Sequence, residues 1–155
     1  MPAPALQHLY PEEFSHCFGC GRLNKEGTQL QSHYIAEENL TLAKVIPDTK
    51  YTGGVPNHLY GGIIASLLDC HGAATAAAFK SLDEGKKLDG SEPIARCVTG
   101  TLSVRYIKPT PLNVELHITG KLISIENRKI TVGLSLTANG EECASGEMLA
   151  IQLKD

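Results

Sequence analysis

The chain has 155 residues, of which 42% are hydrophobic and 20% are charged, and its formal net charge is −3. This length and composition predict one globular domain that spans residues 1–155 and buries a hydrophobic core. The slightly acidic balance excludes the basic surface that nucleic-acid-binding proteins use, so we expect no nucleic-acid partner.

The cysteines and the N-terminal residues indicate a cellular location. Five cysteines are an odd number, and only Cys17 and Cys20 lie close together, which is typical of a reducing compartment. The first 14 residues lack the basic and apolar segments of a secretory signal. Because no run of 18 apolar residues is free of charge, we expect no membrane span. These features together predict a cytoplasmic protein.

The first sixty residues predict loops and two strands. Residues 1–27 are rich in proline, glycine and charge, and we expect a lead-in loop with at most short helical turns. Two segments flanked by polar turns, 28–36 and 40–46, are predicted strands. Glycines and prolines between residues 47 and 60 predict a further loop.

One long central helix is predicted over residues 61–79, GGIIASLLDCHGAATAAAF. Its apolar side chains nearly encircle the helix axis, so we expect burial on most sides. After a polar segment, apolar and polar residues alternate along four segments, which predicts an antiparallel sheet with one buried face. These predicted strands are 98–107, 112–125, 129–138 and 142–153.

The order of these elements predicts an α+β fold. A helix that is apolar on nearly all sides needs a sheet that curls around it and further cover. We therefore expect an antiparallel sheet of about six strands wrapped around one long central helix. A second copy of the chain would cover the remaining apolar surface, which favours a homodimer.

Asp69 is the one acidic residue in the apolar centre of the predicted helix. Burying a carboxylate among apolar groups is costly unless something compensates. On a helix, Asp69 shares a face with Gly62, Ala65, Ser66 and Ala73, and this stripe of small residues leaves room beside the carboxylate. A pocket lined by Asp69 is therefore one interpretation, with Ser66 close enough to orient the carboxylate. The other interpretation is a polar residue hydrogen-bonded within a dimer interface.

Gly61 and Gly62 begin the same helix. The first turn of a helix has free N–H groups and the positive end of the macrodipole, and glycines let a ligand approach closely. An oxyanion donor and a carboxylate are the groups that acyl transfer needs. Eight residues separate Gly61 from Asp69, which is about 12 Å along a helix and too far for both to act on one carbonyl. We therefore expect a site shared between two subunits.

The segment YGGIIASLLD, residues 60–69, resembles the HGG-x-x-A-x-x-x-D signature of hotdog-fold acyl-CoA thioesterases, in particular the phenylacetyl-CoA thioesterase-like branch. FGCG at 18–21 and VRYIKPTPL at 104–112 extend the resemblance over residues 14–153. The resemblance implies a hotdog fold, a homodimer or homotetramer, and hydrolysis of acyl-CoA at the dimer interface. Coenzyme A is then part of the substrate, and no further cofactor and no membrane partner are expected.

The resemblance also assigns roles to single residues. It makes Asp69 the nucleophile or the general base and places the oxyanion-hole amide at Gly61 or Gly62. The basic residue before the proline of the family motif corresponds to Lys108, which would bind the phosphates of coenzyme A. Arg105 is a second basic candidate on the same segment.

One position departs from the family signature. Tyr60 stands where the family has a histidine before the two glycines, and His58 lies two residues earlier. Asn57 or His58 could then hold the thioester carbonyl or the water, and Tyr60 becomes a substrate-binding candidate.

Two other function classes and one metal question stay open. A hotdog dehydratase or hydratase would need an acid–base histidine, and a non-catalytic acyl-CoA-binding module would need no base at all. Cys17 and Cys20, beside His16, could begin a zinc site, but no second pair follows at a suitable spacing. We therefore expect a glycine-rich turn with buried thiols and no metal.

Overall fold

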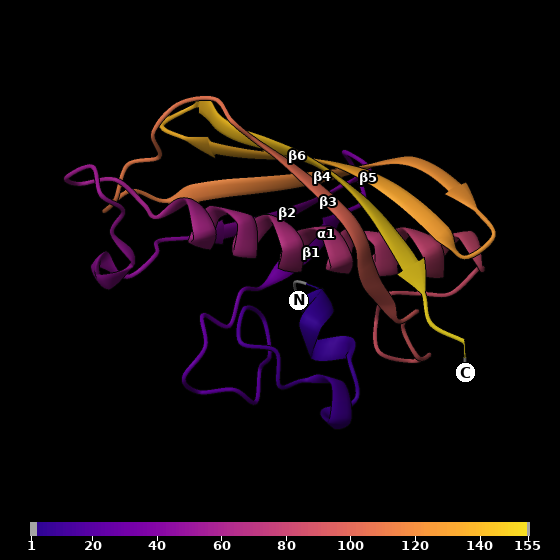
Figure 1. Ribbon diagram of the computed structural model, residues 1–155. Coiled ribbons are helices and arrows are strands. Elements are labelled where there is room, and N and C mark those ends of the chain that lie inside the picture. Colours follow the sequence, from indigo (N-terminus) through magenta and orange to yellow (C-terminus); the bar gives the residue numbers. More distant parts are fainter. Residues whose placement is uncertain (1–2, 155) are drawn as a thin grey trace.

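The computed structural model describes residues 3–154, which form one helix, six strands and three short 3-10 turns (Figure 1). The turns are η1 (Leu6–Leu9), η2 (Glu12–Phe14) and η3 (Thr49–Tyr51), the helix is α1 (Gly61–Asp83), and the strands are β1 (Ser32–Ile35), β2 (Leu40–Val45), β3 (Cys97–Tyr106), β4 (Leu116–Glu126), β5 (Lys129–Ala138) and β6 (Glu141–Gln152).

The strands form one antiparallel sheet in the order β1-β2-β4-β5-β6-β3. Figure 1 shows this sheet along one side of α1 and the N-terminal segment, in indigo, on the opposite side. The predicted α+β architecture, with six strands around one long helix, is confirmed. The short helical turns predicted for residues 1–27 are confirmed as η1 and η2 in the described part of that segment.

Helix α1 begins at the predicted Gly61 but ends at Asp83, four residues beyond the predicted end. Ser81 keeps the last turn in the core, since its hydroxyl accepts a hydrogen bond from the Ala95 amide at 2.8 Å. Gly85, with a φ of 76°, then stops the helix, because its amide and that of Lys86 return to carbonyls of the last turn. The polar segment after residue 79 predicted a helix end that is four residues too early.

Two strands begin later than predicted, at Ser32 instead of residue 28 and at Leu116 instead of residue 112. The amides of Thr28 and Leu30 bond carbonyls of the N-terminal segment, at 2.9 and 3.0 Å, and so do not join the sheet. Asn113 has a positive φ of 62°, which is incompatible with an extended strand. Both segments have strand-like composition but are held by local turns.

The core lies between α1 and the concave face of the sheet, where Leu68, Leu116, Ile118 and Leu136 are fully buried. A second cluster covers the C-terminal half of the helix, where Leu6 of η1 packs with Ala74, Ala77, Ala78 and Ile94. The N-terminal segment therefore covers part of the apolar helix surface that we expected a second copy of the chain to cover.

A buried polar network ties the helix to the outer strands. His71 is fully buried, with its ring nitrogens 2.8 Å from Ser32 Oγ and 3.0 Å from Thr41 Oγ1. Thr75 Oγ1 lies 2.6 Å from the Thr41 hydroxyl. Burial lowers the pKa of His71 to about 4, so the ring is neutral at neutral pH. His71 and Thr75 therefore have a structural role inside the domain.

Helix α1 is long and apolar enough to cross a bilayer by length and composition alone. However, 67% of its most apolar window is buried inside the domain. Its composition is therefore explained by its place as the central helix of the fold.

Candidate active site

Asp69 is partly buried and is held by the first residues of β3. Thr99 Oγ1 donates a hydrogen bond to Asp69 Oδ1 at 2.5 Å. A register shift between Thr99 and Thr101 changes the alternation of β3, so that Thr99 faces the helix. In the described part of the chain, no hydrogen bond joins Ser66 to Asp69, and the Ser66 hydroxyl instead lies near Gly19 of the N-terminal segment. Thr99 thus takes the orienting position considered for Ser66.

A cavity of about 320 Å³ opens beside the Asp69 carboxylate. Its walls come from α1, from the start of β3 and from the N-terminal segment, and they include Tyr10, Phe14, Val98 and Leu153. Arg96 also lines it, with its guanidinium 4.6 Å from the Phe14 ring centre. A carboxylate in a largely apolar cavity open to solvent is the setting expected of a general base or nucleophile.

The start of α1 presents backbone N–H groups. Tyr60 is the N-cap residue and its side chain makes no capping hydrogen bond. The amides of Ile63 and Ile64 bond the Tyr60 carbonyl, at 3.0 and 3.2 Å. The amides of Gly61 and Gly62, as first-turn donors without an intrahelical partner, are therefore the oxyanion-hole candidates.

Aromatic rings pack directly on these glycines. The Tyr106 hydroxyl of β3 donates to the Gly61 carbonyl at 2.9 Å, and a Cβ at Gly61 would lie 3.3 Å from the Tyr106 ring. A Cβ at Gly62 would collide with the Tyr60 ring. Glycine is required at Gly62 as long as that ring keeps its place, since both occupy the same space.

A second cavity, of about 460 Å³, lies at the helix start and is lined by His58, Tyr60, Gly61, Tyr106 and Lys108. The Lys108 ammonium forms an ion pair with Glu141 on the surface. The His58 Nδ1 lies 2.8 Å from the Pro56 carbonyl. Three of the predicted site residues, His58, Tyr60 and Lys108, therefore meet Gly61 in one cavity.

Asn57 and Arg105 lie outside the lining of this second cavity. Asn57 has a φ of 65°, and its carbonyl accepts a hydrogen bond from the Leu112 amide at 2.9 Å, so it shapes the loop before the helix. Arg105 is exposed on β3, next to Tyr106 and on the opposite face of the strand.

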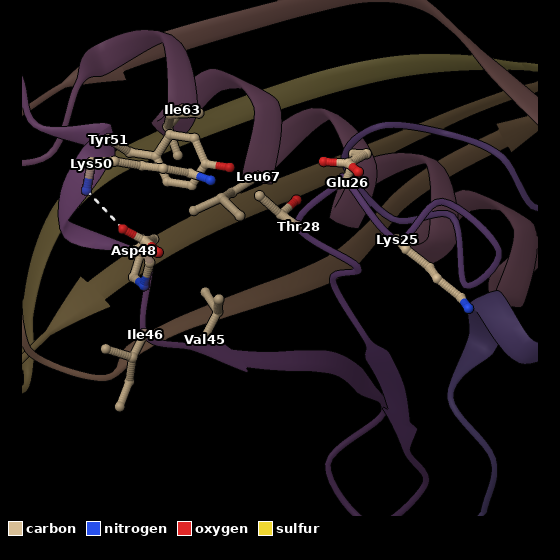
Figure 2. A pocket seen from close by; sticks show the side chains of 12 residues that line it. Lys25, Glu26, Thr28, Val45, Ile46, Asp48, Lys50, Tyr51, Ile63 and Leu67 are labelled. Carbon is tan, nitrogen blue, oxygen red and sulfur yellow. Dashed lines mark hydrogen bonds between the residues drawn. The ribbon is translucent and has the colours of Figure 1, made fainter.

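A third cavity, of about 330 Å³, lies on another side of α1. Figure 2 shows the side chains of Ile63 and Leu67 beside that of Tyr51, with the Lys50 amide donating to the Asp48 carboxylate at 2.8 Å. Neither Asp69 nor Gly61 lines this cavity. Its lining includes the charged residues Asp48 and Lys50, but none of the predicted catalytic residues is among its described lining residues.

Asp69 and Gly61 line separate cavities of one chain, and Gly62 is among the lining residues of neither. Among the described residues, the cavities beside Asp69 and at Gly61 share no lining residue. Strand β3 contacts both places, through Thr99 at Asp69 and through Tyr106 at Gly61. The separation agrees with the distance expected from the helix rise.

Sequence reasoning missed three residues at these places. Thr99 and Tyr106 lie 30 and 45 positions from the helix residues that they contact, so no local spacing indicates them. Cys70 was also missed: its thiol lies with those of Cys17 and Cys20, all within 4.8 Å of one another, which makes these three the candidate ligands of a metal. The position of Cys70 in the sequence, directly after Asp69, does not indicate that its thiol lies beside those of Cys17 and Cys20.

Comparisons with known proteins agree with the architecture. The sequence profile described as Thioesterase superfamily matches residues 56–144. A thioesterase superfamily protein from Shewanella loihica PV-4 is 32% identical, with a TM-score of 0.68 over 94% of this chain and 100% of that one. A search of curated proteins gave no match.

Two more distant solved structures share the fold. A Streptococcus mutans UA159 protein, solved bound to acetyl CoA, is 16% identical with a TM-score of 0.59, over 75% of this chain and 82% of that one. The Escherichia coli PaaI protein from the phenylacetic acid degradation operon is 10% identical with a TM-score of 0.60, over 74% and 73%. The fold is therefore the predicted hotdog fold, which the PaaI protein shares, and the chain belongs to the thioesterase superfamily.

Proposed function

We propose that this protein hydrolyses acyl-CoA thioesters to a free acid and coenzyme A. Asp69 is the nucleophile or general base, and an amide at the start of α1, from Gly61 or Gly62, holds the carbonyl oxygen. In a homodimer each site combines the Asp69 of one subunit with the helix start of the other. Coenzyme A takes part only as a portion of the substrate.

The observation that carries this proposal is the setting of Asp69. Its carboxylate lines an open cavity and accepts one described hydrogen bond, from Thr99, at 2.5 Å. A carboxylate kept for structure alone would be expected to have its acceptor sites filled by packed partners. No described hydrogen bond fills the remaining acceptor sites of Asp69, and a base or nucleophile needs such free sites.

The free edge of β3 supports the shared site. In the sheet formed by residues 3–154, β3 pairs with β6 alone. Its Val98 and Tyr106 side chains are 45% and 54% exposed. An exposed edge with apolar side chains is suited to pairing with a second strand. Two such edges, joined antiparallel about a twofold axis, would make one continuous sheet.

The register that we propose for this pairing is the one that brings together the two contacts of β3 with α1. If the twofold axis passes between Leu102 and Ser103, Thr99 of one subunit lies opposite Tyr106 of the other. Within each subunit, Thr99 is hydrogen-bonded to Asp69 and Tyr106 is hydrogen-bonded to Gly61. The carboxylate of one subunit would then approach the helix start of its neighbour. A homotetramer would consist of two such dimers.

The reaction needs only these groups. As a general base, Asp69 takes a proton from water, whose oxygen attacks the thioester carbon. The negative charge on the carbonyl oxygen is held by the helix-start amide and the helix dipole. The C–S bond then breaks, and the departing thiolate receives the proton from Asp69. As a nucleophile, the Asp69 carboxylate attacks the carbon first, and the C–S bond breaks to release the thiolate, which takes a proton from solvent. Water then hydrolyses the resulting anhydride, which frees the acid and restores the carboxylate.

The coenzyme A portion has a fitting surface at the helix start. Lys108 lines the cavity there and its ammonium is exposed, so it can exchange Glu141 for a phosphate. His58 and Tyr60 line the same cavity and can hold the pantetheine arm or the water. Asn57 positions the loop that carries them, and Arg105, exposed on β3, is a second basic contact. The acetyl CoA in the Streptococcus mutans neighbour agrees with this substrate class.

The test is release of free thiol from a panel of acyl-CoA substrates by the wild type and by Asp69→Asn. Asp83→Asn is the matched control, because Asp83 lies on the same helix with its side chain 54% exposed. We expect turnover by the wild type and the control and its loss in Asp69→Asn, with folding intact. Single-turnover hydrolysis in ¹⁸O-labelled water tests the nucleophilic role, since the label enters Asp69 only when water opens an anhydride at the aspartyl carbonyl.

Two results would replace the proposal by another function. Formation of an enoyl product would indicate a dehydratase or hydratase. Binding of acyl-CoA without turnover by the wild type would indicate a binding module.

A further inference from the structure

We infer that Cys17, Cys20 and Cys70 form a binding site for a thiophilic divalent metal ion, Zn²⁺ being the natural occupant. The site joins the N-terminal segment to α1, one residue beyond Asp69. It is independent of the thioesterase proposal, because it is built from side chains that the proposed chemistry does not use.

The three sulfur atoms have the spacing of a tetrahedral site. All three lie within 4.8 Å of one another, and Cys17 Sγ is 3.8 Å from Cys70 Sγ. In tetrahedral zinc–thiolate coordination with Zn–S bonds of about 2.3 Å, two sulfur atoms are about 3.8 Å apart. A disulfide requires about 2.05 Å between sulfur atoms, and all five cysteines are free. The geometry therefore matches a shared cation better than a covalent bond.

The turn that carries Cys17 and Cys20 is built around the cluster. A Cβ at Gly19 would collide with Cys70 Sγ, so glycine there lets the turn approach the helix. A Cβ at Gly21 would lie 2.5 Å from the Cys17 nitrogen, while the Gly21 amide bonds the Cys17 carbonyl at 2.8 Å. These two glycines close the turn tightly and place both thiols on the side of Cys70.

The next residues fix the turn from the other side. Thr28 donates from its hydroxyl to the Gly19 carbonyl at 2.6 Å and from its amide to Phe18 at 2.9 Å. The Leu30 amide bonds the Gly19 carbonyl at 3.0 Å. The ligands are thus held in place by the fold, so little conformational entropy is lost when a metal binds.

The cluster is accessible to an ion from solvent, because Cys17 is exposed. The three cysteines also line the cavity beside Asp69, so water from this cavity can take the fourth coordination position. When the ion binds, the thiol protons are released to solvent, because the ligands are thiolates.

Such an ion would have a structural effect near Asp69. The cavity beside Asp69 has one wall from the N-terminal segment, and the metal would tie this wall to Cys70 of the helix. Three thiolate ligands with soft sulfur donors select Zn²⁺ over Mg²⁺ or Ca²⁺. The ion would therefore stabilise the wall of the cavity.

The test uses the full chain, reduced and stripped of metal with a chelator, and titrated with Co²⁺ and Zn²⁺ under anaerobic conditions. We expect thiolate-to-cobalt charge-transfer absorption that saturates at one equivalent and is abolished by Zn²⁺. Mg²⁺ should have no effect. Hydrogen exchange of the amides in residues 15–21 should slow when Zn²⁺ binds.

Cysteine-to-serine variants identify the ligands. Cys17→Ser and Cys70→Ser should lose the charge-transfer band, and the exposed Cys17 is the safer change for folding. Cys97→Ser is the matched control, because Cys97 lines the same cavity but lies outside the cluster, and it should keep the band. The inference is overturned if the reduced wild type gives no thiolate–cobalt absorption, or if folded Cys17→Ser and Cys70→Ser retain it.

Discussion

The two halves of helix α1 have similar compositions of small and apolar residues but opposite surroundings. In the first half, residues 61–69 of this fully described helix, three side chains are buried, those of Ile64, Leu67 and Leu68. In the second half most are buried: Cys70, His71, Gly72, Ala74, Thr75, Ala76, Ala77, Ala78, Phe79 and Ser81. The first half therefore borders open space and the second half belongs to the core.

The cover opposite the sheet causes this difference. Leu6 and Ile94 close over the second half, where they pack on Ala74, Ala77 and Ala78. The first half meets cavities at Gly61 and beside Asp69. Small residues on a central helix therefore do not by themselves indicate either a packed core or a cavity. In the second half they fit closely packed neighbours, and in the first half they leave room for a substrate.

The largest effect is expected from a substitution of Asp69 in the first half, which should lower activity without lowering stability. Asp69→Asn keeps the shape of the side chain but removes the base, and thioester hydrolysis should fall by about 10²- to 10⁴-fold. Its free energy of unfolding should stay within about 1 kcal/mol of the wild type, since Asp69 is only partly buried. Thiol release and urea denaturation measure the two quantities.

The reverse is expected in the second half. Phe79 is 5% exposed, and its ring packs edge-on against Tyr34 at 5.8 Å between centres. Phe79→Ala should lower the free energy of unfolding by about 3–5 kcal/mol, because it leaves a cavity in the core. Activity per folded molecule should stay at the wild-type value. A loss of turnover without a loss of stability would contradict the division of the helix.

A smaller effect is expected at the residue that positions Asp69. Hydrogen bonds to charged groups contribute about 1.5–3 kcal/mol, so Thr99→Val should lower kcat/KM by about 10- to 100-fold. Thr99→Ser keeps the hydroxyl and should restore most of the activity. If the serine variant is as impaired as the valine variant, the impairment does not follow the hydroxyl, and the hydrogen bond from Thr99 does not position the carboxylate.

The smallest effect is expected at the surface. Lys108 is exposed and paired with Glu141, and surface charge pairs contribute about 0.2–1 kcal/mol. Lys108→Ala should therefore raise KM for acyl-CoA by about two- to fivefold and leave kcat unchanged. A truncated thioester without the nucleotide phosphates is the control, and its KM should not respond. An equal rise in KM for both substrates would show that Lys108 does not bind the phosphates.

The sequence predicted those features that depend on neighbours along the chain. The Gly61–Gly62 pair after a loop predicted the helix start, alternation predicted the last four strands, and flanking polar turns predicted the first two. The apolar circumference predicted a central helix. The end at Asp83 was misplaced because the tertiary bond from Ala95 to Ser81 extends the helix beyond its apolar part.

The features that the sequence could not predict depend on how distant segments meet. Asp69 was predicted as a site residue, but its hydrogen-bond donor was not, because the contact with Thr99 depends on the irregular register of β3. The course of the N-terminal segment decides both the cover of the helix and the meeting of Cys17 with Cys70. Local spacing holds no information about either.

The most direct measurement of the shared site is complementation between two inactive variants. Asp69→Asn lacks the carboxylate. Gly61→Pro removes one candidate amide at the first position of the helix, where proline is tolerated, and Gly62→Ala disturbs the other by placing a Cβ where the Tyr60 ring lies. The folded variant that loses turnover is co-expressed with Asp69→Asn under a different affinity tag. Assemblies purified through both tags should regain up to about half of the wild-type activity, since one of the two sites in a mixed dimer is intact. Mixed assemblies that stay inactive, although both chains are folded and paired, would contradict the account.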